Sequence, residues 1–112
     1  MEKQLGKITN VRFGRGGYQD VQFGLSLTFE GKSWGCGTII TGGWAYGHLS
    51  PDKHTKWTEE DRTKSMAEMC QKIDKVLGDA GVDDVAKLKN MPVEVTFDGN
   101  TMKDWRILKE VL

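Results

Sequence analysis

A strong helical period of apolar residues occurs in the middle of the chain. Between Thr58 and Gly81, apolar residues recur at steps of three and four, the spacing of one apolar stripe along a helix. The stripe comprises Met66, Met69, Cys70, Ile73, Val76, Leu77 and Ala80. Thr58 is a good N-cap because its hydroxyl can accept a hydrogen bond from a backbone N–H of the first turn. Gly81 suits the end of the helix. The pattern predicts a long amphipathic helix between these two residues.

Strand-like patterns precede this helix. Residues 5–14 are typical of a strand, and the change of phase between Ile8 and Val11 indicates a bulge. Residues 18–29 alternate apolar and polar positions, which predicts a half-buried antiparallel strand. After a turn, residues 33–40 return as a third strand. We expect the glycines at 35 and 37 in this strand to leave room for a close neighbour.

The last third of the chain predicts a short helix and a hairpin. Asp83 or Asp84 can cap a short helix that runs through Leu88. The segment from residue 92 onward alternates, turns at residues 98–100 and returns through Trp105, Ile107, Leu108 and Val111. The order of strands, helix and strands predicts a single α+β domain over residues 1–112. Its antiparallel sheet carries one long amphipathic helix and one short helix.

Charge and cysteine content narrow the classes of function. Sixteen basic and sixteen acidic residues give a formal net charge of zero, which argues against a DNA or RNA polymer as partner. Cys36 and Cys70 have no disulfide or zinc-ligand spacing, so we expect a reducing, cytoplasmic setting. No apolar run approaches the length of a membrane span. We therefore expect no membrane contact.

The motifs do not favour an enzyme. Residues 41–57 form a long segment without periodicity that contains aromatic residues, and we expect it to be ordered by packing. His48 and His54 lie in this segment without a carboxylate at a metal-ligand spacing, so we expect no metal site. No nucleophile motif and no acidic pair on rigid elements is present. We expect no cofactor and no catalytic residues.

The first turn of the long helix contains a candidate anion-binding residue. Arg62 lies close to the positive backbone N–H groups of this turn, where an anion could bind. A salt bridge to Glu59 or Asp61 is the alternative. Trp57 precedes the N-cap and either packs in the core or lies along the Arg62 side chain through a cation–π contact.

The other candidate binding residues lie in turns and in the last hairpin. Arg106 follows Trp105 on a strand, so the two side chains point to opposite faces. Asn100 lies in a DGN turn, where it is either a ligand contact or a positive-φ turn residue. The GRGGY string has the glycines of a phosphate-binding loop but is followed by a strand, which favours a hairpin turn. The candidate ligand-binding residues are Arg62, Arg106, Asn100, Trp57, Trp105, Phe97, Arg15 and Gly17.

Five strings in the sequence resemble those of a known protein family. FGRGGYQD, SWGCG, KWTEEDR and PVEVTFDGN followed by WRILKEVL resemble the phage Thoeris anti-defence proteins of the first type, from about Gly6 to Leu112. The resemblance implies a sponge in the infected bacterial host that sequesters a cyclic ADP-ribose isomer made by a TIR-domain immune protein, without degrading it. It also implies homo-oligomers built from dimers, such as a trimer of dimers, in which cyclic oligonucleotides bind at separate sites.

The residues are compatible with this function and leave two rivals open. A cyclic ADP-ribose isomer presents an adenine, two riboses and a pyrophosphate, so binding needs an aromatic ring, arginines and amide or hydroxyl partners. A small domain encloses such a ligand most easily at a subunit interface, and the apolar stripe of the helix predicts a dimer. The rivals are a small hydrolase of the same signal and a regulatory module that binds another protein.

Overall fold

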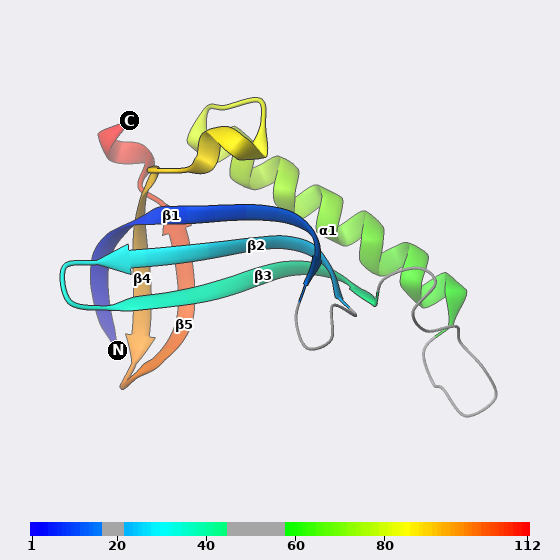
Figure 1. Cartoon of the computed structure of the whole chain (residues 1–112), viewed down its shortest axis with the longest axis horizontal. Helices are drawn as coiled ribbons and strands as arrows, with labels where there is room; N and C mark the ends of the chain where they lie inside the picture. The colour runs from blue at the N-terminus through cyan, green and yellow to red at the C-terminus, as the bar shows by residue number, and fades with distance from the viewer. Residues whose placement is uncertain (17–21, 45–57) are drawn as a thin grey trace.

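β1 (Glu2–Gly16) is the strand around which the sheet is built. The computed structural model describes residues 1–16, 22–44 and 58–112. These residues form a five-stranded sheet with the order β3-β2-β1-β4-β5, in which all neighbours are antiparallel. The other strands are β2 (Gln22–Gly31), β3 (Gly35–Trp44), β4 (Pro92–Asp98) and β5 (Thr101–Ile107), and the long helix α1 spans Glu59–Ala80 (Figure 1). The predicted α+β fold is confirmed.

The two halves of β1 pair with different strands. Residues 2–7 pair with β4, and residues 6–16 pair with β2. The register shifts between Ile8 and Asn10, which confirms the predicted bulge. A bulge bends a strand and increases its twist. In Figure 1, β4 and β5 accordingly cross the direction of β1, β2 and β3.

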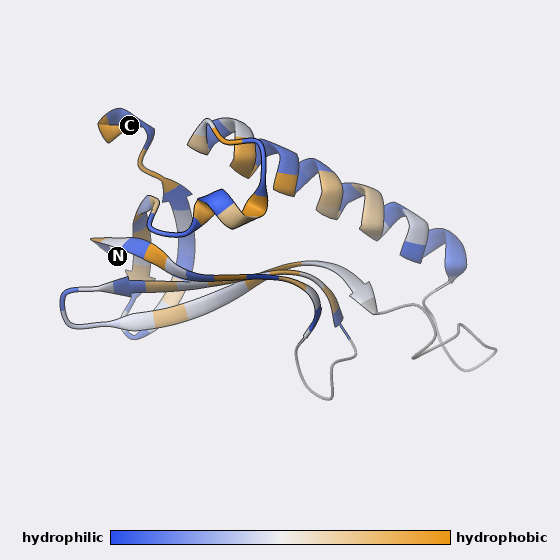
Figure 2. Ribbon diagram, turned by 45° about the horizontal axis from the view of Figure 1, so that its top comes forward, coloured by the Kyte–Doolittle hydropathy of each residue, from blue (hydrophilic) through white to orange (hydrophobic). Residues whose placement is uncertain are grey.

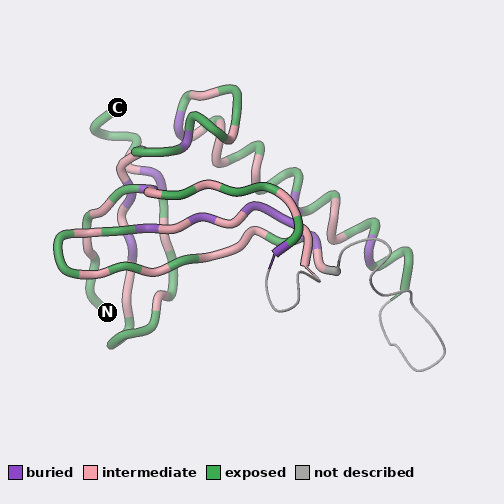
Figure 3. Tube along the Cα trace, in the orientation of Figure 1, coloured by how far each residue is buried: buried purple, intermediate pink, exposed green. Residues whose placement is uncertain are grey.

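The core lies on one face of this bent sheet. Leu25, Leu27 and Phe29 alternate along β2 as predicted, and all three are buried. Figure 3 shows buried stretches along this strand. β1, β4 and β5 add Ile8, Val93, Val95 and Ile107 to the same cluster. Ile73, Val76 and Leu77 of α1 pack against it, and the helix lies along one side of the sheet (Figure 2). The apolar stripe of α1 is therefore largely covered by the chain's own sheet.

The ends of α1 follow the sequence closely. The Thr58 hydroxyl accepts a hydrogen bond from the Asp61 backbone N–H at 3.1 Å, and the Thr58 N–H donates to the Asp61 carboxylate at 2.9 Å. These reciprocal bonds form a capping box. Gly81 ends the helix with a φ of 69°. Both predicted caps are confirmed.

The glycines against which a bulky side chain packs are not the two that the sequence predicts. Added Cβ atoms at Gly35 and Gly37 would meet atoms no closer than 3.3 Å. A Cβ on Gly31 or Gly6 would instead overlap the indole of Trp34, and one on Gly42 would collide with Met66. The alternation of a strand does not reveal which glycine faces a bulky neighbour, because that depends on pairing register and helix placement.

β3 extends further than the sequence predicts. Its pairing with β2 continues from Gly24 opposite Thr41 to Gln22 opposite Trp44. Residues 41–44 therefore belong to a strand and not to the predicted loop. Residues 45–57, with His48, His54 and Trp57, lie outside the described residues.

The C-terminal third differs in two details. The predicted short helix is a 3-10 helix, η2 (Val85–Leu88), capped by the Asp84 carboxylate on the Ala86 N–H at 2.8 Å. β5 ends at Ile107, and a 3-10 turn, η3 (Lys109–Val111), follows, so Leu108 and Val111 do not continue the strand. Within the described residues, no helix has the length and apolar character needed to cross a membrane.

Candidate functional site

A groove between α1 and β5 contains two of the predicted site residues. This α1–β5 groove has a volume of about 330 Å³. β5 contributes Trp105 and Arg106, and α1 contributes Lys72 and Lys75. The remaining lining residues are Ile40, Val76, Asp79, Asp104 and Ile107. The residues that line this groove thus include a tryptophan, three basic residues and several apolar residues.

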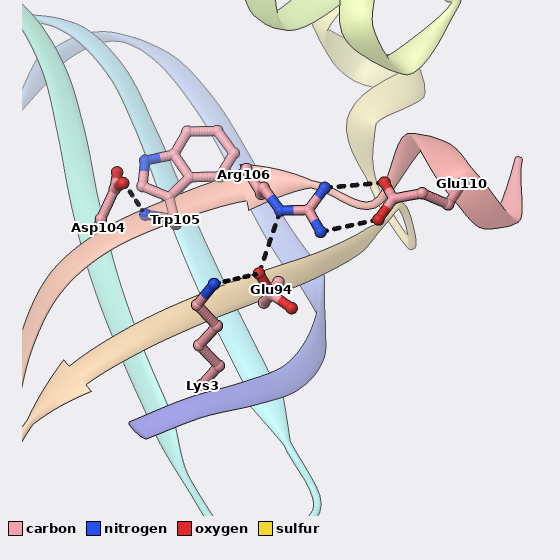
Figure 4. A network of polar contacts seen from close by, with 6 residues as sticks. All are labelled: Lys3, Glu94, Asp104, Trp105, Arg106 and Glu110. Atoms are coloured by element: carbon pink, nitrogen blue, oxygen red, sulfur yellow. Dashed lines mark hydrogen bonds and ion pairs between the residues drawn. The ribbon is translucent and has the colours of Figure 1, made fainter. Parts of the chain in front are cut away.

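Arg106 is held by two carboxylates. Its Nη atoms donate to both oxygens of Glu110 at 2.8 and 2.7 Å, and its Nε donates to Glu94 at 3.1 Å (Figure 4). Lys3 lies 3.9 Å from the same Glu94 oxygen. Hydrogen bonds from Arg106 lower the pKa of Glu110 to about 2, and bonds to Glu110 and Glu94 raise the pKa of Arg106. The bidentate fork is the arrangement in which arginine also binds phosphate.

Trp105 points to the other face of β5, as the sequence predicts. Figure 4 shows its indole directed away from the Arg106 guanidinium. The ring centroid lies 4.9 Å from that of Phe29, with the planes tilted by 43°. Trp105 therefore packs partly against the core, and the rest of its ring lines the groove. Stacking on this ring is confined to the exposed part.

The cations of α1 differ in how they are engaged. Lys75 donates to Asp79 at 2.8 Å, and Lys109 lies 3.6 Å from the other oxygen of Asp79. Hydrogen bonding from Lys75 is the largest cause of the lowered pKa of Asp79. Among the residues that the structure describes, Lys72 forms no ion pair. Lys72 is therefore the groove cation most available to an anion.

Phe97 and Asn100 lie in a second groove, at the far end of the last hairpin. This groove, of about 360 Å³, is lined by Glu2, Gln4, Ser33, Trp34, Gly35, Phe97, Gly99 and Asn100. The edge of Trp34 contacts Phe97 with ring centroids 5.2 Å apart. The positive φ of the turn belongs to Gly99. Asn100 is exposed and does not have a positive φ, so the interpretation of Asn100 as a positive-φ turn residue is wrong.

Arg62 lies far from both grooves. It is 3% exposed, and its Nη1 donates to Glu59 at 2.9 Å, as the salt-bridge interpretation predicted. At 1.5 Å per residue, Arg62 and Lys75 are about 20 Å apart along α1. One chain therefore does not bring Arg62 and Arg106 into a common pocket.

Of the remaining candidates, the structure describes Arg15, which lines neither of these grooves. Arg15 is exposed near the end of β1. Gly17 and Trp57 lie outside the described residues, so the proposed contact of Trp57 with Arg62 lies outside them as well.

Sequence reasoning missed three side chains that line the grooves. Lys72 and Lys75 are three residues apart on α1, a spacing that places them on one side of the helix and that could have been read from the sequence. Trp34 is not among the candidate binding residues, and its position against Phe97 depends on how the sheet folds. Within the described residues, no cluster of three His, Cys, Asp or Glu side chains could hold a metal ion.

Comparison with known proteins did not assign a family. The chain matches no protein-family model, no curated protein and no solved structure.

Proposed function

We propose that this protein binds and sequesters a nucleotide signal, a cyclic ADP-ribose isomer, without degrading it. The observation that supports this most is the α1–β5 groove, whose lining includes Trp105 and Arg106 of β5 and Lys72 and Lys75 of α1. A pyrophosphate suits the cations, and an adenine suits the indole. The resemblance of the sequence strings to phage Thoeris anti-defence proteins favours this signal and its synthesis by a bacterial TIR protein.

In the proposed complex, the pyrophosphate takes the place of the Glu110 carboxylate on Arg106. The fork that now donates two bonds to Glu110 would donate them to phosphate oxygens instead. Lys72 adds a second positive charge from α1. Stacking of the base on an aromatic ring contributes about 1–3 kcal/mol.

One open groove does not supply the affinity that a sponge needs. Nanomolar binding corresponds to about 12 kcal/mol, and tight sites bury most of the ligand surface. A second copy of the chain could close the groove and bury more of the ligand surface at the subunit interface. The proposal therefore includes a homo-oligomer, at least a dimer. Cyclic oligonucleotides are further proposed ligands of higher assemblies, at separate sites.

The lining of the α1–β5 groove favours binding over covalent catalysis. Within the part of the chain that the structure describes, no serine, cysteine or histidine lines it. The hydrolase alternative remains an outcome of the experiment, as does the protein-binding module.

Titration with the purified cyclic ADP-ribose isomer, followed by mass spectrometry of what heating releases, tests the proposal. We expect submicromolar binding and recovery of intact ligand. Lys72→Ala should weaken binding about tenfold, a loss of about 1.4 kcal/mol. Lys89 is exposed and lies outside this groove, so Lys89→Ala should leave the affinity for the ligand unchanged. Recovery of a cleaved product would establish the hydrolase instead, and absence of nucleotide binding would overturn both.

A further inference from the structure

A second surface of α1 has the opposite charge character. Between α1, the segment before η2 and β1 lies a groove of about 430 Å³, which we call the acidic groove. Its apolar lining consists of Phe13, Cys70, Ile73, Leu77 and Val85. Its polar lining consists of Asp74, Asp83 and Asp84, and no lysine or arginine among the described residues belongs to it.

The strand beside this groove has an open edge over the described residues. β1 pairs with β4 only as far as Lys7, and the Asn90–Met91 turn bonds the backbone of Ile8. From Asn10 to Gly16, β2 on the other side is the only strand that pairs with β1 within residues 1–16, 22–44 and 58–112. In an antiparallel pair, every second residue directs its N–H and C=O away from the partner. This edge therefore presents the backbone donors and acceptors that an added strand uses.

Phe13 connects the open edge to the groove. It belongs to β1, lines the acidic groove and is 49% exposed. Its ring contacts Phe23 edge-on, with centroids 5.3 Å apart, which fixes its position on the sheet. A strand added to β1 would therefore place alternate side chains beside Phe13 and toward the apolar lining on α1.

The aspartates of the acidic groove indicate the charge of the molecule that would bind there. Asp83 accepts a bond from Lys87 at 2.6 Å, and Asp84 caps η2. Asp74 forms no ion pair with any described residue. The chain has no net charge, yet the charged side chains described in this groove are all aspartates, whereas the α1–β5 groove combines Lys72 and Lys75 with Asp79 and Asp104. Such local segregation of charge favours a basic partner here.

We propose that the acidic groove binds an extended basic segment of another protein, which adds as a strand to β1. The segment alternates apolar residues with lysine or arginine, because its apolar side chains meet the groove and its cations meet the aspartates. Strand addition provides main-chain hydrogen bonds for affinity and pockets for alternate side chains. The open edge of seven residues spans roughly 23 Å, enough for a strand of six or seven residues. This inference does not depend on the proposed nucleotide function.

The probe is an acetylated and amidated hexapeptide of alternating valine and lysine, carrying a fluorophore. We expect saturable binding by fluorescence anisotropy, weakened by added salt, and slower amide hydrogen exchange at residues 10–16. The same peptide with glutamate in place of lysine should not bind. Equal binding of the two peptides would overturn the charge argument.

Two N-methylated peptides test strand addition itself. A strand uses the N–H groups of alternate residues along one edge. Methylation of one alternate set should therefore abolish binding, and methylation of the other set should leave it intact. Equal effects of the two sets would overturn strand addition.

Matched variants locate the site. Asp74→Asn combined with Asp83→Asn should weaken peptide binding about tenfold, with Asp84 kept because it caps η2. Glu68→Gln, an exposed carboxylate of α1 outside the groove, should bind as the parent protein does. If the double variant instead changes the oligomer mass while the peptide fails to bind, the groove is an interface between copies and the proposal is wrong.

Discussion

Arg106 fastens the C-terminal 3-10 turn to the sheet through Glu110 and Glu94. The folded pKa of Glu110, about 2, lies below its ordinary value of 4.5 because Arg106 donates to it. A carboxyl group whose pKa is lower in the folded protein stabilises the fold at pH values above its ordinary pKa. This stabilisation is lost as the pH falls toward the pKa of the folded state. We expect the turn to detach between about pH 4.5 and 2.

An NMR titration of the Glu110 carboxyl carbon checks this expectation. In Arg106→Gln, the midpoint should move back toward 4.5, because the principal donor is gone. A midpoint near 4.5 in the parent protein would show that the fork does not form in solution.

Glu110 also competes with any anion that binds Arg106. Glu110→Gln should therefore raise the affinity for inorganic pyrophosphate, by about two- to fivefold, since an exposed ion pair is weak. Calorimetry against Glu110→Asp, which keeps the charge on a shorter side chain, isolates the charge effect. Unchanged or lower affinity in the glutamine variant would remove Arg106 from the anion site.

Among the elements, α1 depends on a cap that the sequence specifies. Thr58→Ala removes the hydroxyl that accepts from Asp61 N–H and should lower the free energy of unfolding by about 1 kcal/mol. Thr58→Ser keeps the acceptor and should cost much less. Denaturant unfolding measures both, and equal losses would show that the methyl group rather than the cap matters.

The contact between α1 and β3 depends on Gly42. A Cβ at this position would collide with the Met66 side chain and lie 3.2 Å from its Cα, so the helix would have to shift. We expect Gly42→Ala to destabilise the fold by about 1–3 kcal/mol, as overpacking does. Gly35→Ala in the same strand, whose nearest contacts are 3.7 Å, is the matched control.

A double variant tests whether Met66 is the cause. Adding Met66→Ala to Gly42→Ala should recover part of the loss, because contacting residues are energetically coupled. Additive losses would place the strain in the β3 backbone itself.

At the scale of the whole molecule, most of the apolar stripe of α1 is not available for contact with a second copy. The proposed oligomer therefore has to form through another surface. Met69 and Ala80 are buried and Ile73, Val76 and Leu77 pack on the core, so the length of the stripe no longer requires a partner. A second copy that closes the α1–β5 groove would use the side of α1 that carries Lys72 and Lys75.

Light scattering at micromolar concentration checks the assembly. We expect a mass of at least two chains, and Lys72→Glu, which places a negative charge at the proposed contact, should lower it. A mass of 12.6 kDa, that of one chain, in the parent protein would contradict the oligomer and the shared site together.

The sequence by itself determined the features that depend on near neighbours along the chain. The alternation at Leu25, Leu27 and Phe29 specified a half-buried strand, and Thr58 with Gly81 specified the limits of α1. Periods of 2 and 3.6 are visible locally because each position repeats within one or two turns of its own element. The existence of the strands and their succession along the chain could be predicted for the same reason.

The tertiary structure decided what depends on residues distant in sequence. Trp34 lies over Gly6 and Gly31 because these two glycines are partners in the β1–β2 pairing, next to the turn that carries Trp34. Arg62 and Arg106 are separated because of the way α1 lies along the sheet. The amino-acid sequence of either segment alone does not predict this placement. Pairing register and helix placement arise from packing many weak contacts at once, so the two grooves beside α1 emerge only when the chain is folded.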